Sequence, residues 1–129
     1  MLSSTEPRTI LVVEDEPILR MDAVDLLEQA GFAVIEAANG PAALLLLAER
    51  DDVGLLFTDV QMPGQPNGFG LARQVHAERP EVAIVVCSGL HRPGPDDLPP
   101  EAQFIDKPFT PQMVLKIIER FDLPRRTTA

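Results

Sequence analysis

The chain has 129 residues, 45% of them hydrophobic, so we expect one soluble domain with a single core. Its 11 Lys and Arg against 20 Asp and Glu give a net charge of −9, which argues against direct nucleic acid binding, because that binding needs clustered cations. No apolar stretch reaches the roughly 20 residues of a membrane helix, and the single cysteine excludes an internal disulfide. These properties favour a cytoplasmic protein without membrane insertion.

Short apolar runs alternate with segments of helical spacing. The runs are bounded by turn residues, as buried parallel strands are, and lie at about residues 10–13, 32–35, 55–58, 82–87 and 103–105. Helices are predicted to begin at Pro17, at Asn39-Gly40-Pro41, after Gly68 and at Pro111, with Thr110 as an N-cap. This alternation predicts an α/β fold in which helices cover both faces of a parallel sheet.

One predicted crossover departs from this pattern. Residues 89–100, between the fourth and fifth predicted strands, include prolines at positions 93, 95, 99 and 100. Proline removes a backbone donor and clashes inside a helix, so we expect a loop or a distorted turn in place of a full fourth helix. The domain is predicted to span residues 8–123, with short tails at residues 1–7 and 124–129.

Polar side chains follow four of the predicted strands. Glu14 and Asp15 follow the first, Asp59 the third, Ser88 the fourth and Lys107 the fifth. Ligands of parallel sheets bind beyond the carboxyl ends of the strands, so we expect these groups to meet at one edge. Three carboxylates, a hydroxyl and an ammonium suit a divalent metal, Mg²⁺ above all, together with a phosphoryl group.

Simpler interpretations exist for each of these residues. Glu14 and Asp15 alone favour a capping role, since the N-terminus of a helix attracts negative charge. Lys107 alone would be a surface lysine at a turn, and Ser88 a turn serine. Asp59 could be a metal ligand, a nucleophile that forms an aspartyl phosphate, or both. The combination at matching strand ends favours the metal and phosphoryl site.

With these residues, the sequence resembles the receiver domain of two-component response regulators. The resemblance covers about residues 8 to 122, in the family's order and spacing, and rests on Leu11-Val12-Val13-Glu14-Asp15-Glu16-Pro17, Asp59 with Met62-Pro63-Gly64, Ser88-Gly89 and Lys107-Pro108-Phe109. It implies a flavodoxin-like three-layer sandwich with a five-stranded parallel sheet of order 2-1-3-4-5. It also implies a switch rather than a turnover enzyme.

The resemblance assigns the metal ligands and the nucleophile. Asp59 would be the phosphoacceptor. Asp15, Asp59 and the backbone carbonyl of Gln61 would hold Mg²⁺ directly, and Glu14 would act through a water molecule.

The resemblance also assigns the groups that bind the phosphoryl oxygens. Lys107 and Ser88 would bind through their side chains, and Val60 and Gly89 would contribute from the backbone. Phe104 would be the switch aromatic that turns inward when Ser88 moves, although plain core packing is the alternative.

Two features differ from the common pattern of the family. The loop after Asp59 is one residue longer than the commonest form, and the proline-rich segment stands where the fourth helix usually contributes to output and dimerisation. We therefore expect a monomer or a weak dimer rather than the usual dimer.

The predicted function is Mg²⁺-dependent phosphoryl acceptance on Asp59 from a histidine kinase or a histidine phosphotransfer protein. We expect no output domain, and we therefore expect the signal to pass to a protein partner that the sequence does not name. The alternatives are a pseudo-receiver that binds partners without phosphorylation, a phosphate sink for another receiver, and a receiver severed from a longer regulator.

Three other classes of site fit the residues less well. An aspartate-nucleophile phosphatase would carry an acid where this chain has Gln61, which has no proton to give. A flavin site would need a phosphate loop where Glu14-Asp15-Glu16 would repel phosphate. His76 and His91, without a cysteine partner, make a poor zinc site.

Overall fold

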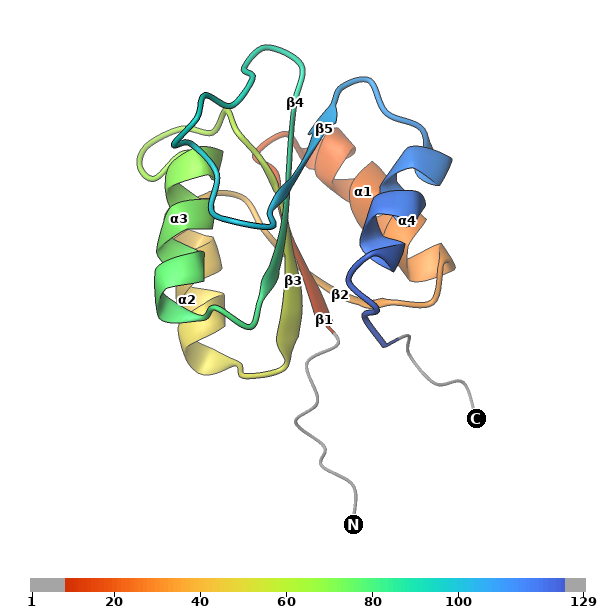
Figure 1. Cartoon of the computed structure of the whole chain (residues 1–129). Coiled ribbons are helices and arrows are strands. Elements are labelled where there is room, and N and C mark those ends of the chain that lie inside the picture. Colours follow the sequence, from red (N-terminus) through yellow and green to blue (C-terminus); the bar gives the residue numbers. More distant parts are fainter. Residues whose placement is uncertain (1–8, 125–129) are drawn as a thin grey trace.

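The computed structural model describes residues 9–124, which form a three-layer α/β sandwich (Figure 1). Its five strands pair in parallel in the order β2-β1-β3-β4-β5. They are β1 (Thr9–Val13), β2 (Ala33–Ala37), β3 (Val53–Asp59), β4 (Ala83–Ser88) and β5 (Gln103–Asp106). The predicted flavodoxin-like sheet of order 2-1-3-4-5 is therefore confirmed. The predicted tails, apart from Pro124, lie outside the described residues.

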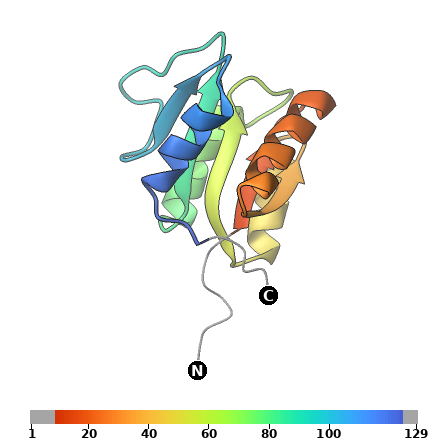
Figure 2. The ribbon, with the colours of Figure 1, turned by 90° about the vertical axis from the view of Figure 1, so that its right-hand side faces the viewer.

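Helices cover both faces of the sheet in the described part of the chain, namely α1 (Pro17–Gln29), α2 (Gly40–Glu49), α3 (Gly68–Glu78) and α4 (Pro111–Glu119). Helices α2 and α3 lie on one face, and α1 and α4 lie on the other (Figures 1 and 2). The four helices begin as the sequence predicts. Each has an N-cap side chain that accepts backbone N–H groups of the first turn; these caps are Glu16, Asn39, Asn67 and Thr110.

The core is divided by the sheet into two layers. Alternate residues of a strand face opposite sides, so Leu11 and Val13 of β1 pack beneath α2 and α3, while Ile10 and Val12 pack beneath α1 and α4. Strands β1 and β3 are buried along their whole length, which explains their continuous apolar sequence. None of the helices within residues 9–124 combines the length and the apolar character needed to cross a membrane.

The crossover from β4 to β5 contains turns and no helix within the described residues, as the prolines predict. Arg73 of α3 holds this segment, because its Nη1 donates to the carbonyl oxygen of Asp97 at 3.1 Å. Leu98 and Ala102 pack against the core layer beneath α2 and α3. The segment thus covers part of the surface that a helix would otherwise occupy.

Candidate functional site

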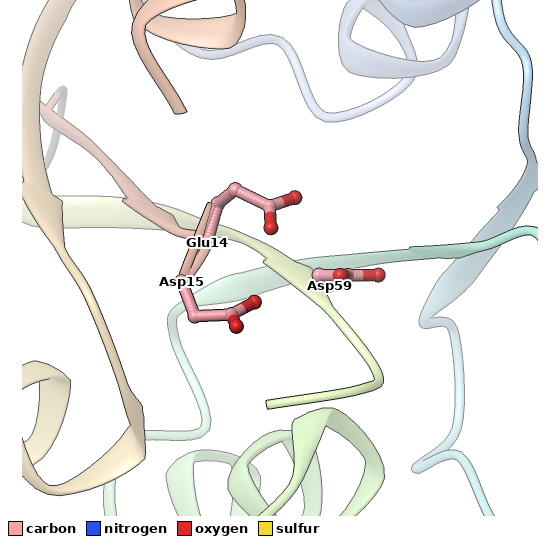
Figure 3. Close-up of side chains that lie close together, drawn as sticks. All are labelled: Glu14, Asp15 and Asp59. Atoms are coloured by element: carbon pink, nitrogen blue, oxygen red, sulfur yellow. The ribbon is translucent and has the colours of Figure 1, made fainter. Parts of the chain in front are cut away.

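The predicted acidic cluster forms where β1 and β3 end. Val13 and Thr58 are paired neighbours in the sheet, so the residues after them, Glu14 and Asp59, reach the same edge side by side. Carboxylate oxygens of Glu14, Asp15 and Asp59 lie within 4.8 Å of one another. Figure 3 shows the Glu14 and Asp15 carboxylates pointing towards the side on which Asp59 lies. Glu14 and Asp59 are buried, whereas Asp15 is exposed.

Lys107, directly after β5, is the cation of this cluster. Its Nζ lies 3.2 Å from Glu14 Oε1 and 3.4 Å from Asp59 Oδ1. Burial, the largest single influence, would lower the pKa of Lys107, but the charges of Asp59 and Glu14 oppose it and the pKa is raised. Lys107 therefore stays charged and compensates only part of the negative charge of the three carboxylates.

The Glu14 carboxyl group has a raised pKa in this arrangement. Burial raises its pKa above the ordinary value of 4.5, and the nearby charge of Asp59 raises it further. The backbone N–H of Glu16, which donates to Glu14 Oε2 at 3.2 Å, and the Lys107 ammonium oppose this shift without cancelling it. An excess of carboxylate oxygens with one exposed member is the donor set that a hard divalent cation such as Mg²⁺ prefers, so these residues fit the metal.

The position of Asp59 depends on the backbone around it. Its Oδ1 accepts from the Val60 N–H at 2.9 Å, and the Val60 carbonyl accepts from Gly68 N–H at 2.8 Å. A Cβ atom at Gly68 would lie 2.1 Å from the Asp59 carbonyl oxygen, so only glycine permits this approach of α3 to the end of β3. The sequence places Gly68 at a helix start but does not reveal this contact.

Ser88 lies at the end of β4, next to the cluster. It is buried, and its Oγ accepts from the backbone N–H groups of Leu90 at 3.2 Å and His91 at 2.9 Å. Its carbonyl accepts from the Lys107 N–H at 3.1 Å, which ties the end of β4 to the start of the loop after β5. Because the hydroxyl oxygen accepts these two hydrogen bonds, its proton is available to donate a hydrogen bond to a third group at the carboxyl ends of the strands.

The remaining predicted residues lie around this centre. Val60 is buried, Gln61 is exposed two residues beyond Asp59, and Gly89 is exposed beside Lys107. Phe104 of β5 is half-buried against the core layer beneath α2 and α3. Its packing agrees with both interpretations given above, so its switch role stays a prediction.

Sequence reasoning missed Arg20 of α1. Its Nη1 donates to the Glu14 carbonyl oxygen at 3.0 Å, and its Nε donates to Glu36 Oε1 at 2.8 Å. Arg20 thus fixes the backbone from which the Glu14 side chain projects. Its place one turn into the first predicted helix, six residues after Glu14, could have suggested this role, whereas its second partner, Glu36, lies 16 residues further along the chain.

Comparison with known proteins defines the class of the molecule. The family model of the response regulator receiver domain matches residues 10–119. The chain belongs to this family, whose members are the receiver domains of two-component systems. Receiver domains are in general signalling modules rather than enzymes.

Individual relatives agree with this assignment. The chain is 34% identical over 116 residues to the response regulator receiver protein CpdR of Brucella abortus, covering 88% of this chain and 95% of CpdR. It is 35% identical over 106 residues to the sensor kinase CckA of the same species, covering 79% of this chain but only 11% of CckA. Among solved structures, a response regulator receiver protein from Sinorhizobium medicae aligns with a TM-score of 0.83 and 29% identity, over 92% of this chain and 96% of that one.

Proposed function

We propose that this receiver accepts a phosphoryl group on Asp59 with Mg²⁺ bound at the acidic cluster. The observation that carries the proposal is the contact of the Lys107 ammonium with Asp59, at 3.4 Å, inside a group of three converging carboxylates. Such an arrangement supports the roles of Asp59 as a nucleophile, of Lys107 as a cation for phosphoryl oxygens and of the three carboxylates as metal ligands.

Each residue has a defined part in the proposed transfer. Asp15, Asp59 and the Gln61 carbonyl would hold Mg²⁺, with Glu14 acting through water. The bound ion would supply positive charge for the phosphoryl oxygens.

The proposed covalent step takes place on Asp59. One carboxylate oxygen of Asp59 forms the new bond to phosphorus as the bond from phosphorus to the donor's histidine nitrogen breaks. Lys107 and the Ser88 hydroxyl would then hold phosphoryl oxygens, together with the backbone N–H groups of Val60 and Gly89.

The donor in this proposal is a histidine kinase or a histidine phosphotransfer protein. Ile18, Leu19 and Met21 of α1 are exposed large apolar side chains close to the acidic cluster in the chain. An apolar cavity of about 560 Å³ beside the cluster is lined by Leu19, Phe109 and Asp59, among others. A donor that buries apolar side chains here would hold its phosphohistidine close to Asp59.

We further propose that residues 8–123 form the phosphoryl-accepting unit, that it acts in the cytoplasm as a monomer or weak dimer, and that its output is contact with a protein partner. Its acidic charge supports a partner other than nucleic acid. Two uses of the same chemistry, a signal and a phosphate sink, differ in whether the phosphorylated form binds such a partner.

The test is incubation with Mg²⁺ and acetyl phosphate, followed by measurement of the intact mass, beside the variant Asp59→Asn. We expect the wild type to gain one phosphoryl group in the presence of Mg²⁺, and the variant to gain none. If no adduct forms, beryllofluoride binding tests whether hydrolysis is simply fast. Failure to bind beryllofluoride would support the pseudo-receiver.

A further inference from the structure

A second, separate cavity adjoins the site on the β4–β5 side of the sheet edge. It has a volume of about 430 Å³, and its walls include Ser88 and Lys107 of the site together with Arg92 and Asp106. Two of these four side chains carry positive charge and one carries negative charge. Of the four, none but Ser88 and Lys107 has a part in the phosphoryl site proposed above.

The loop after β4 turns back over Ser88 and thereby brings Arg92 to this cavity. The backbone N–H groups of Leu90 and His91 donate to Ser88 Oγ. Ser88 is the paired neighbour of Asp106 in the sheet, and Arg92 Nη2 lies 3.1 Å from Asp106 Oδ2. The Arg92 guanidinium is therefore held beside the strand ends that also carry Ser88 and Lys107.

The ion pair with Asp106 that holds Arg92 in the structure is weak. The side chains of Arg92 and Asp106 are 77% and 50% exposed, and exposed ion pairs contribute little because water screens them. A phosphoryl group carries close to two negative charges and three acceptor oxygens, which match the planar fork of a guanidinium. A phosphoryl group on Asp59 would thus compete well against Asp106 for Arg92.

We propose that Arg92 is a second cationic ligand of the phosphoryl group, which it binds by exchanging Asp106 for phosphoryl oxygens. This inference rests on the proposed function of Asp59. It gives the proline-rich segment a direct role, since a residue of that segment senses the modification. The exchange moves the loop that also bonds to Ser88, so both side chains respond to the same phosphoryl group.

The test is a calorimetric titration of the Mg²⁺-loaded protein with beryllofluoride, an analogue of the phosphoryl group. Arg92→Gln should bind about fivefold more weakly, the upper end for an exposed charge pair. Asp106→Asn should bind more tightly, because it frees Arg92 and removes a competing negative charge. In the double variant the gain from Asp106→Asn should shrink, because Arg92 is no longer there to be freed.

Arg120→Gln is the matched control. Arg120 is also exposed and also contacts β5, through a hydrogen bond from Nη1 to Gln103 Oε1 at 3.1 Å, but it does not line this cavity. Its substitution removes the same charge and should leave beryllofluoride affinity close to that of the wild type. Circular dichroism of each variant checks that folding is unchanged.

Three results would overturn the inference. If Arg92→Gln and Asp106→Asn change the affinity in the same direction, their ion pair only holds the loop. If Arg92→Gln behaves like Arg120→Gln, its effect is one of overall charge. If the wild type itself binds no beryllofluoride, the proposed function fails, and the role of Arg92 fails with it.

Discussion

The pKa of a carboxyl group is shifted in opposite directions at the two ends of the parallel strands, which we call the amino edge and the carboxyl edge. At the amino edge, Asp52 accepts two hydrogen bonds from Arg50, at 2.9 and 2.7 Å, and one from Thr9 Oγ1 at 2.7 Å. The hydrogen bonds from Arg50 hold the pKa of Asp52 well below its ordinary value. At the carboxyl edge, burial and the charge of Asp59 raise the pKa of Glu14.

The difference lies in how many donors each carboxylate receives. Asp52 pairs with the guanidinium of Arg50, whereas Glu14 and Asp59 share the ammonium of Lys107 and have the Asp15 carboxylate within 4.8 Å of their own oxygens. A satisfied carboxylate stabilises the fold, and an under-compensated one lowers the stability of the metal-free protein while raising its affinity for a cation. The amino edge is therefore suited to stability, and the carboxyl edge to the cation binding proposed above.

The largest expected effect comes from the backbone that supports the carboxyl edge. Gly68→Ala should reduce the free energy of unfolding by about 1–3 kcal/mol, because its Cβ would overlap the Asp59 carbonyl oxygen. Urea denaturation measures the change. Gly94→Ala is the control, since the nearest atom to a Cβ at this position would be Asp97 Oδ2, a side-chain atom 3.4 Å away. Equal midpoints for the two variants would show that the contact is not tight.

The next effect tests the charge excess itself. Glu14→Gln should weaken Mg²⁺ binding at least about tenfold, as loss of a supporting metal-site group commonly does. The same variant should make the metal-free protein more stable at neutral pH, because it removes a buried negative charge. Since the pKa of Glu14 is raised in the fold, this gain should shrink as the pH falls towards the ordinary value of 4.5 and should be absent below it.

Calorimetry with Mg²⁺, and urea denaturation from about pH 4, below the ordinary glutamate pKa, to about pH 7, measure both consequences of Glu14→Gln. Glu28→Gln, at an exposed position of α1, is the control and should change neither quantity. A destabilised metal-free variant at pH 7 would contradict the view that Glu14 opposes folding.

At the amino edge, removal of a carboxylate is expected to lower the stability of the protein rather than raise it. Asp52→Asn should reduce the free energy of unfolding by about 1 kcal/mol at pH 7, because the partly exposed ion pair with Arg50 is lost. The pKa of Asp52 is lowered in the folded state, so the wild-type advantage should be present above 3.8 and decline as the pH falls below it. Asp51→Asn, at the exposed neighbouring position, should have little effect at any pH.

The smallest effect concerns Cys87, which lies beneath the carboxyl edge. Burial raises the pKa of its thiol to about 12, with the charge of Lys107 opposing the shift. A disulfide reagent at pH 8 should therefore react slowly with the native protein and quickly in urea. Because the neutral thiol is favoured in the fold, its contribution should be constant below the ordinary value of 9.0 and decline as the pH rises above it. Fast native reaction would show that the edge opens readily.

Most of the fold follows from local sequence signals. Proline at the first turn and Asn or Thr caps locate the helix starts at Pro17, Gly40 and Pro111, where the structure has them. The ends of the strands are predicted less accurately. The apolar pattern predicts β2 at 32–35, whereas the structure has Ala33–Ala37, because β2 is an edge strand whose pairing with β1 continues past the polar Glu36.

The candidate site, like the fold, can be predicted from the sequence only in part. Glu14, Asp15, Asp59, Ser88 and Lys107 can be located from the sequence, because each follows a strand-like run and parallel strands present their ends at one edge. Their distances cannot, since these depend on how the strands pair. Supporting contacts made by residues distant in the chain leave no local pattern in the sequence.

By itself, the sequence determined the alternation of strands and helices, the loss of the fourth helix and the kinds of group at the strand ends, because hydrophobic spacing, proline and capping act within a few residues. Tertiary structure alone decided that Lys107 reaches both Glu14 and Asp59, that Arg20 holds the Glu14 backbone and that Arg92 meets Asp106. The Lys107 and Arg92 contacts arise only when the sheet brings separate segments together, whereas the Arg20 contact with Glu14 spans six residues and depends on the path of the chain into α1. The electrostatic character of the site depends on the Lys107 contacts.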